Sequence, residues 1–211
     1  MPLFLKIEKD NLRGLLSVFS QSYRIIGPQV LSGTIVLEEI KAYELPLHYI
    51  DQHGQGTYRL LAERSPFLFS FSTGPDSFKK FLFPPERTLF HFGYNKKRLS
   101  AETIESPEKP LLLFGLRACD TEALRLYDRV LSDDREYRLR RDNSIIVAIN
   151  CPFPHENCFC SSLSTGPQVK EADIIITELS EYLLLEVQSE ELVNFIRDIP
   201  HKEINGRDLE E

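Results

Sequence analysis

The sequence has no cysteine in its first 118 residues and only four in the remainder. It also has no apolar run approaching the roughly 20 residues that span a bilayer, so no membrane span is predicted. A net charge of −7 leaves no basic excess of the kind that a general nucleic-acid surface requires. The glycine-rich phosphate motifs G-x-G-x-x-G and G-x-x-x-x-G-K-[ST] and the nucleophile elbow G-x-S-x-G are missing. The sequence therefore does not support an enzyme with a glycine-rich nucleotide-binding loop or a serine hydrolase.

The few cysteines are predicted to be reduced. The start, Met-Pro-Leu-Phe-Leu-Lys, is too short and too soon polar for a secretory signal, which predicts a cytoplasmic protein. Disulfides are the weaker interpretation in that compartment. Cys158 and Cys160 flank a single residue, which is poor geometry for a mutual disulfide. Metal binding or redox chemistry is favoured instead.

The first part of the chain, residues 1–94, predicts an α+β unit. A short strand at 3–5 precedes an amphipathic helix that begins near Asp10, with Asp10 and Asn11 as candidate caps. Its apolar face follows helical spacing through Leu12, Leu15, Leu16 and Phe19. Short β runs then predict a largely antiparallel layer, with strands at 24–26, 33–37, 58–61, 67–71 and 88–92. In the run 67–71, Phe67, Phe69 and Phe71 alternate and are predicted to face the core. Residues 95–110 are charged and proline-rich, so we predict a surface linker.

The second part, residues 111–200, predicts an α/β unit with parallel strands. Apolar runs at 111–116 and 144–149 are typical of strands buried on both faces. Asp120 can cap a helix between them, followed by a charged turn at 132–143. Later elements are predicted as strands at 173–177 and 182–187 and a helix at 190–196, with a loose tail at 201–211. The predicted fold class is α/β, or α+β when the chain is taken as a whole. The two parts are predicted as separate units, with one continuous domain as the alternative.

Topology predicts that the cysteines meet. Strands joined by a helical crossover are parallel, so their carboxyl ends lie at the same edge of the sheet. Cys119 follows the end of the first buried run and Cys151 the end of the second. This is the edge where α/β sheets place ligands. Cys158 and Cys160 lie in the loop that leaves the second strand and need only fold back.

The cysteine spacing is C-x₃₁-C-x₆-C-x-C. It identifies the bound group less clearly than the strand topology identifies the place where the cysteines meet. It fits neither the paired knuckles of structural zinc nor the C-x₂-C-x₂-C run of ferredoxins. Its wide reach favours an iron–sulfur cluster, which spreads its ligands further than one ion does. Serine, threonine and glycine residues from Ser161 to Gly166 can supply N–H donors to such a cluster. Zinc and unligated thiols remain open alternatives.

The segments Gly115-Leu-Arg-Ala-Cys-Asp120 and Asn150-Cys-Pro-Phe-Pro-His-Glu-Asn-Cys-Phe-Cys-Ser-Ser-Leu-Ser-Thr-Gly-Pro167 resemble the amino-terminal, non-ferredoxin part of a known family. It comprises the hydrogenase/sulfhydrogenase beta subunits and the anaerobic sulfite reductase A-type subunits. Further similar pieces are Gly56-Thr-Tyr-Arg-Leu60, Gly74-Pro75 and Lys80-Phe-Leu-Phe-Pro-Pro85. The resemblance extends over about residues 20–190, and its specific part is the cysteine block.

The resemblance implies an iron–sulfur electron carrier between a flavin-containing, NAD(P)-linked subunit and a catalytic subunit. It implies one [4Fe–4S] cluster with Cys119, Cys151, Cys158 and Cys160 as ligands. Members of the family usually continue into a two-cluster ferredoxin-like module, and this chain has no cysteines left for one. We therefore expect either an amino-terminal fragment or a short relative that uses such a module in cis or in trans.

Three other residues are candidates near the cysteines. Arg117 can stabilise a cluster's negative charge or bind a phosphate, with a surface salt bridge as the alternative. Asp120 can help the site, although a helix cap is the expected role. His155 can replace a thiolate as a ligand, whereas an exposed loop histidine is the commoner case.

Two small basic clusters are candidate contacts for an acidic partner or a phosphate, with solvated loops as the default interpretation. They comprise Lys79, Lys80, Lys96, Lys97 and Arg98. Two functions of other classes stay open beside electron transfer. One is a thiol redox protein with Cys158 or Cys160 as a reactive nucleophile. The other is a zinc-stapled interaction module.

Overall fold

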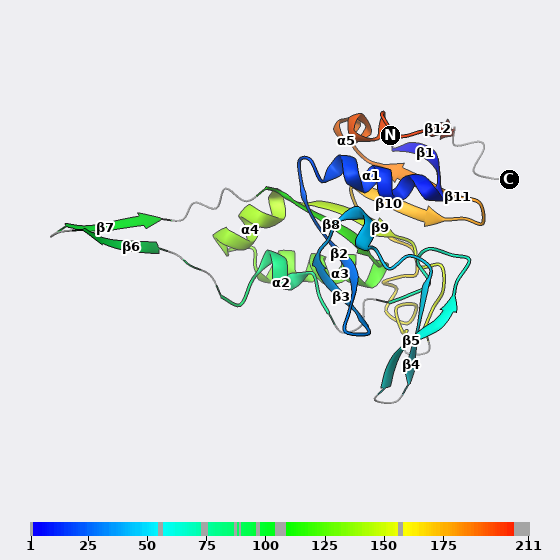
Figure 1. The fold of residues 1–211 in the computed structure, drawn as a ribbon, viewed down its shortest axis with the longest axis horizontal. Helices are drawn as coiled ribbons and strands as arrows, with labels where there is room; N and C mark the ends of the chain where they lie inside the picture. Colours follow the sequence, from blue (N-terminus) through cyan, green and yellow to red (C-terminus); the bar gives the residue numbers. More distant parts are fainter. Residues whose placement is uncertain are drawn as a thin grey trace.

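An eight-stranded mixed sheet forms the centre of the protein (Figure 1). The structure is a computed structural model, and it describes residues 2–54, 57–72, 76–86, 88, 90–95, 98–103, 109–155 and 158–204. The strand order is β12-β1-β11-β10-β9-β8-β2-β3. Its strands are β1 (Leu3–Glu8), β2 (Arg24–Leu31), β3 (Thr34–Glu39), β8 (Leu111–Leu116), β9 (Ile145–Ile149), β10 (Ile174–Glu178), β11 (Tyr182–Val187) and β12 (His201–Ile204).

The centre of this sheet is parallel and its edges are antiparallel. β2, β8, β9 and β10 run parallel to one another, while β3, β11, β1 and β12 add antiparallel pairs at the two sides. All six residues of β8 are buried, as expected of a parallel strand covered on both faces. The predicted α/β class is confirmed.

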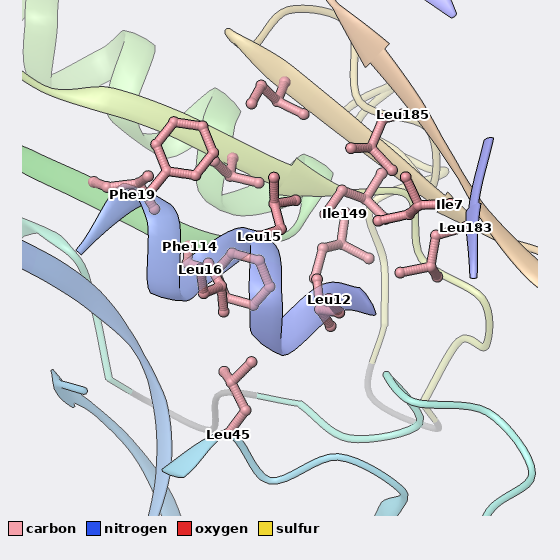
Figure 2. Packing of buried hydrophobic residues seen from close by; sticks show 14 of the residues in the cluster. Ile7, Leu12, Leu15, Leu16, Phe19, Leu45, Phe114, Ile149, Leu183 and Leu185 are labelled. Carbon is pink, nitrogen blue, oxygen red and sulfur yellow. The ribbon is translucent and has the colours of Figure 1, made fainter. Parts of the chain in front are cut away.

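One face of the sheet is covered by α1 (Leu12–Phe19) and α5 (Glu190–Ile196). A 3₁₀ turn, Lys9–Asn11, leads into α1. The four periodic apolar residues of α1 predicted from the sequence are all buried. Figure 2 shows them against side chains of the sheet such as Phe114, Ile149 and Leu185. The Phe19 ring also stacks on that of Phe195, with 5.0 Å between centroids, and so joins the two helices.

The opposite face is covered by α2 (Lys79–Leu82), α3 (Ala118–Val130) and α4 (Arg135–Asp142). Leu82, Leu124 and Tyr137 pack there against strand residues that alternate with those of the first face. The result is a three-layer α/β arrangement. No helix in the described part of the chain combines the length and the apolar character needed to cross a bilayer.

Two small hairpins form separate two-stranded sheets. β4 (Tyr49–Gly54) pairs with β5 (Thr57–Arg64), and β6 (Phe90–Asn95) pairs with β7 (Arg98–Thr103). A short 3₁₀ helix, Ala42–Glu44, precedes the first hairpin. In Figure 1 the β6–β7 hairpin extends away from the central sheet.

Several local predictions were wrong. Residues 67–71 form a loop with a turn at 68–69 instead of a strand, although Phe69 and Phe71 are buried as a core-facing side would be. The predicted charged turn at 132–143 contains α4, because the Asp134 carboxylate accepts hydrogen bonds from two N–H groups of its first turn. Residues 201–204 of the predicted loose tail form β12, and residues 205–211 lie outside the described residues.

The amino-terminal predictions differ in two further ways. Neither Asp10 nor Asn11 makes a side-chain capping bond to α1. The predicted antiparallel layer is only partly antiparallel, because β2 pairs in parallel with β8. Strands from before and after residue 110 share the main sheet, and β7 lies within the predicted linker 95–110. The division into two parts stays a prediction.

Candidate metal centre

Two adjacent parallel strands bring Cys119 and Cys151 to one edge of the sheet. β8 ends at Leu116, and Cys119 lies in the first turn of α3 directly after it. β9 ends at Ile149, and Cys151 follows two residues later. The two strands pair in parallel, as predicted from the sequence, so both thiols lie at the carboxyl edge of the sheet.

The thiols lie close enough to affect one another electrostatically. Burial raises the pKa of Cys119 to about 11, and the charges of Asp120 and Cys151 add to this. Burial also raises the pKa of Cys151; Arg117 opposes the shift, while Cys158 and Cys160 add to it. All four thiols are free. Among the described residues, no three His, Cys, Asp or Glu side chains are close enough together to hold a single metal ion.

The loop after Cys151 folds back toward the start of α3. The N–H of Thr165 donates to the carbonyl of Cys160 at 2.9 Å, and the N–H of Cys151 donates to that of Pro167 at 3.2 Å. A Cβ at Gly166 would lie 3.2 Å from the Cys160 Sγ and 3.1 Å from the Ala118 Cβ. Glycine at this position therefore permits the close approach of the loop to the helix.

A backbone amide already points at one of the sulfurs. The N–H of His155 donates to the Sγ of Cys158, with 3.2 Å between the heavy atoms. Such N–H···S bonds stabilise negative charge on sulfur. The backbone amides of Ser162, Ser164 and Thr165, predicted as donors to a cluster, instead donate to carbonyls within their own turn.

Arg117 is buried, with 7% of its surface exposed, so the surface salt-bridge alternative was wrong. Its Nη2 donates to the carbonyls of Phe69 and Phe71 at 2.9 and 2.7 Å. Its Nη1 is buried and has no hydrogen-bond partner. A buried cationic donor without an acceptor is costly unless an anion satisfies it.

Asp120 is the third residue of α3, and Arg117 occupies the N-cap position that was expected for Asp120. The Oδ2 of Asp120 accepts from the backbone N–H of Arg117 at 2.9 Å and so stabilises the first turn of the helix. Burial raises the pKa of this carboxyl, while the hydrogen bond and the charge of Arg117 oppose that shift.

A second loop, residues 65–72, reaches the same edge, and its residues carry little local pattern that predicts this position. Besides Arg117, two buried carboxylates hold it. Glu178, at the end of β10, accepts from the N–H groups of Leu68 at 2.6 Å and Phe69 at 3.1 Å, and its Oε1 lies 2.9 Å from the Lys9 Nζ. In the sequence, the signal for this role of Glu178 is its position as a carboxylate at the end of an apolar strand.

Asp51 is the other buried carboxylate, and it connects this loop to the cysteine loop. Its carboxylate accepts hydrogen bonds from the backbone N–H of Ser72, at 3.1 Å to Oδ1 and 3.0 Å to Oδ2. The Ser72 hydroxyl donates to the same Oδ2 at 2.7 Å. The Nε2 of His155 lies 3.7 Å from its Oδ1. The Phe67 and Phe153 rings also meet edge to face, 4.9 Å apart. His155 is thus a partly buried neighbour of Asp51, not an exposed loop histidine.

The predicted basic clusters lie elsewhere. Lys80 pairs with Asp76 at 2.9 Å and with Glu38 at 3.2 Å, so its charge is used within the fold. The Lys79 Nζ lies 5.2 Å from the Tyr127 ring centroid. Lys96 and Lys97 lie outside the described residues.

Comparison with known proteins gives one informative match. The chain is 35% identical over 114 residues to sulfhydrogenase 2 subunit beta of Pyrococcus furiosus. The resemblance to the hydrogenase beta subunits is confirmed. The matched part covers 53% of this chain but only 32% of the Pyrococcus subunit, so the chain spans about a third of that relative. No family model and no solved structure matches.

The residues at this edge fit an anionic, thiolate-bound group. Four thiols provide the ligand number of an iron–sulfur cluster. The unpaired Nη1 of Arg117 and the N–H···S bond to Cys158 add the positive surroundings that such a group needs.

Proposed function

We propose that this chain is an iron–sulfur electron-transfer subunit, or part of one, in a hydrogenase-type oxidoreductase. One [4Fe–4S] cluster would be held by Cys119, Cys151, Cys158 and Cys160. The observation that carries the proposal is the placement of Cys119 and Cys151 at adjacent parallel strand ends, with the remaining two in a loop that returns to α3. The similarity to a sulfhydrogenase beta subunit supports the same assignment.

When bound, such a cluster supplies one-electron redox chemistry. The protein's own residues set its surroundings. Arg117 provides a fixed positive charge beside Cys151, which favours the more negative, reduced state of a neighbouring group. The N–H of His155 reduces the charge on the Cys158 sulfur, and Asp51 holds the loop that carries His155. The chain would therefore bind and tune a relay site and make no bonds in a substrate.

The proposal includes partners by class. The chain would pass electrons between a flavin- and NAD(P)-binding subunit and a catalytic subunit, in the cytoplasm. A ferredoxin-like module, in cis or in trans, would continue the path. The Pyrococcus relative is itself named as a subunit of a sulfhydrogenase, which supports an assembly of several chains.

Replacing one proposed ligand tests this assignment. Cys119→Ser should lose most of the bound iron and the broad visible absorption of anaerobically purified protein, because the hydroxyl is a poor replacement for a thiolate ligand to iron. Ser162→Ala, in the turn after Cys160, is the matched control and should keep both. Iron retained in Cys119→Ser would contradict the assigned ligand set. Colourless wild-type protein with one zinc would support the stapled module instead, and colourless protein with rapidly titrating thiols the redox protein.

A further inference from the structure

One buried cation beside the thiols carries a donor group that the fold leaves unused. Arg117 lies between β8 and α3, and only 7% of its surface is exposed. Among the residues that the structure describes, its Nη1 is the only buried side-chain nitrogen or oxygen without a hydrogen-bond partner. Buried polar groups are almost always paired, because an unpaired one has lost its bonds to water without replacement. Nη1 therefore points to an acceptor that the described residues do not supply.

The rest of the Arg117 guanidinium is held in place by loop 65–72. Its Nη2 donates to the carbonyls of Phe69 and Phe71, at 2.9 and 2.7 Å, and its central carbon lies 5.8 Å from the Phe71 ring centroid. The Glu178 carboxylate holds the same loop through two backbone N–H groups. A guanidinium is planar and rigid, so fixing Nη2 also fixes the direction of the Nη1 donors. Nη1 is thus preorganised by a loop that carries no cysteine.

The position of this cation relative to the thiols identifies the chemistry of the acceptor. Burial raises the pKa of Cys151 and the charge of Arg117 opposes that shift, so the guanidinium lies within electrostatic reach of this thiol. The acidic neighbour Asp120 accepts from the backbone N–H of Arg117, not from its side chain. The thiolates and sulfides of an iron–sulfur cluster are negatively charged and accept N–H hydrogen bonds. A sulfur atom at the cysteine site is therefore the acceptor that fits.

We infer that the Nη1 of Arg117 donates a hydrogen bond to a sulfur atom of the bound cluster and thereby sets its reduction potential. This inference rests on the proposed function for the presence of the cluster, and it adds a tuning residue to the four ligands. Reduction adds one electron, supplied by the flavin-linked partner subunit, and breaks no bond in this chain. Arg117 keeps its proton throughout, because a guanidinium is not deprotonated in proteins. Its donor stabilises the added negative charge and so raises the reduction potential.

A redox titration of anaerobically purified protein measures this effect. In Arg117→Gln the equilibrium constant for one-electron reduction should fall about tenfold, which lowers the midpoint potential by about 59 mV. Arg125→Gln is the matched control, because it removes the same charge from an exposed residue of α3 that pairs with Glu122. Its potential should stay that of wild type, since solvent screens an exposed charge. An unchanged potential in Arg117→Gln with full iron content would overturn the inference.

A spectroscopic measurement on the wild-type chain avoids any substitution that could disturb folding. The protein is produced with arginine that carries ¹⁵N only in the guanidinium, and its cluster is reduced with dithionite. Pulsed electron paramagnetic resonance then records the nuclei that couple to the unpaired electron of the cluster. We expect a ¹⁵N coupling and an exchangeable proton coupling, and Arg117→Gln should lack both. A wild-type spectrum without ¹⁵N coupling, or one that persists in Arg117→Gln, would overturn the inference.

Iron and sulfide are measured in every sample, which separates this inference from the proposed function. Wild-type protein without iron would overturn both the cluster and the hydrogen bond to it. A full cluster without ¹⁵N coupling would overturn only the role of Arg117, and the assignment of the four cysteines would stand. If Arg117→Gln fails to fold or to hold iron, the presence or absence of ¹⁵N coupling in the labelled wild-type chain decides the question.

Discussion

Glu178 provides the most quantitative test of how the carboxyl edge of the sheet is built. Its side chain is fully buried, it accepts hydrogen bonds from two backbone N–H groups of loop 65–72, and it pairs with Lys9. The same loop supplies the carbonyls that Arg117 binds. Glu178 thus connects β10 to the loop that lies beside the cysteines.

The magnitude follows from what Glu178→Ala leaves behind. Two N–H groups of the loop would lose their acceptors, at about 1–3 kcal/mol for each one that stays buried. Lys9, 15% exposed at its side chain, would lose its counter-charge. Removing one partner of a buried ion pair typically costs about 3–5 kcal/mol, and we expect a free-energy loss in that range. Glu178→Gln keeps one oxygen acceptor and should cost about 1–3 kcal/mol.

The assay is urea unfolding followed by circular dichroism, with thermal unfolding as a second measure. At about 2–4 °C per kcal/mol for a chain of this size, Glu178→Ala should unfold about 10 °C lower than wild type. Glu181→Ala, an exposed carboxylate in the same turn, is the control and should change stability by less than about 0.5 kcal/mol. A loss of under about 1 kcal/mol in Glu178→Ala would refute the reasoning, because the loop would then not depend on this carboxylate.

Three further outcomes are expected. Phe19→Ala should destabilise the protein by about 3–5 kcal/mol in urea unfolding, because it empties a fully buried site; a loss below 1 kcal/mol would contradict the packing. Burial opposes ionisation of Asp76, but hydrogen bonds from the Leu37 N–H and from Lys80 outweigh it and lower its pKa. The stability from this group is therefore present above the pKa of unfolded Asp, about 3.9, and is lost as the pH falls further. The advantage of wild type over Asp76→Asn should shrink below about pH 4 in acid titrations of unfolding, and a constant difference down to pH 2 would contradict this. Gly166→Ala should lower iron content per chain, because its Cβ crowds the Cys160 Sγ; unchanged iron would show that the loop shifts freely.

The parts of the fold that could be predicted are those where the apolar pattern is strong. The run 111–116 and the helical rhythm from Leu12 to Phe19 gave β8 and α1, because burial on both faces or on one helical stripe is visible in the residues themselves. α4 was missed because only Tyr137 of its eight residues is buried, so its charged sequence hides the helix. Its capping residue, Asp134, was the available signal.

The site was predictable only where topology determines it. Parallel strands place Cys119 and Cys151 at one edge regardless of loop detail. The contributions of Asp51 and Glu178 were not predictable, because their partners lie in loop 65–72, where the alternating phenylalanines predict a strand at 67–71. Such long-range contacts of a buried carboxylate with backbone N–H groups carry no local sequence pattern.

The central claim is that the four thiols hold one iron–sulfur cluster. Iron and acid-labile sulfide per chain, measured on anaerobically purified protein, test it most directly. The account predicts about four of each, the composition of a [4Fe–4S] cluster. A chain that is folded by circular dichroism but contains neither iron nor sulfide, with one zinc or with four titratable thiols, would contradict it.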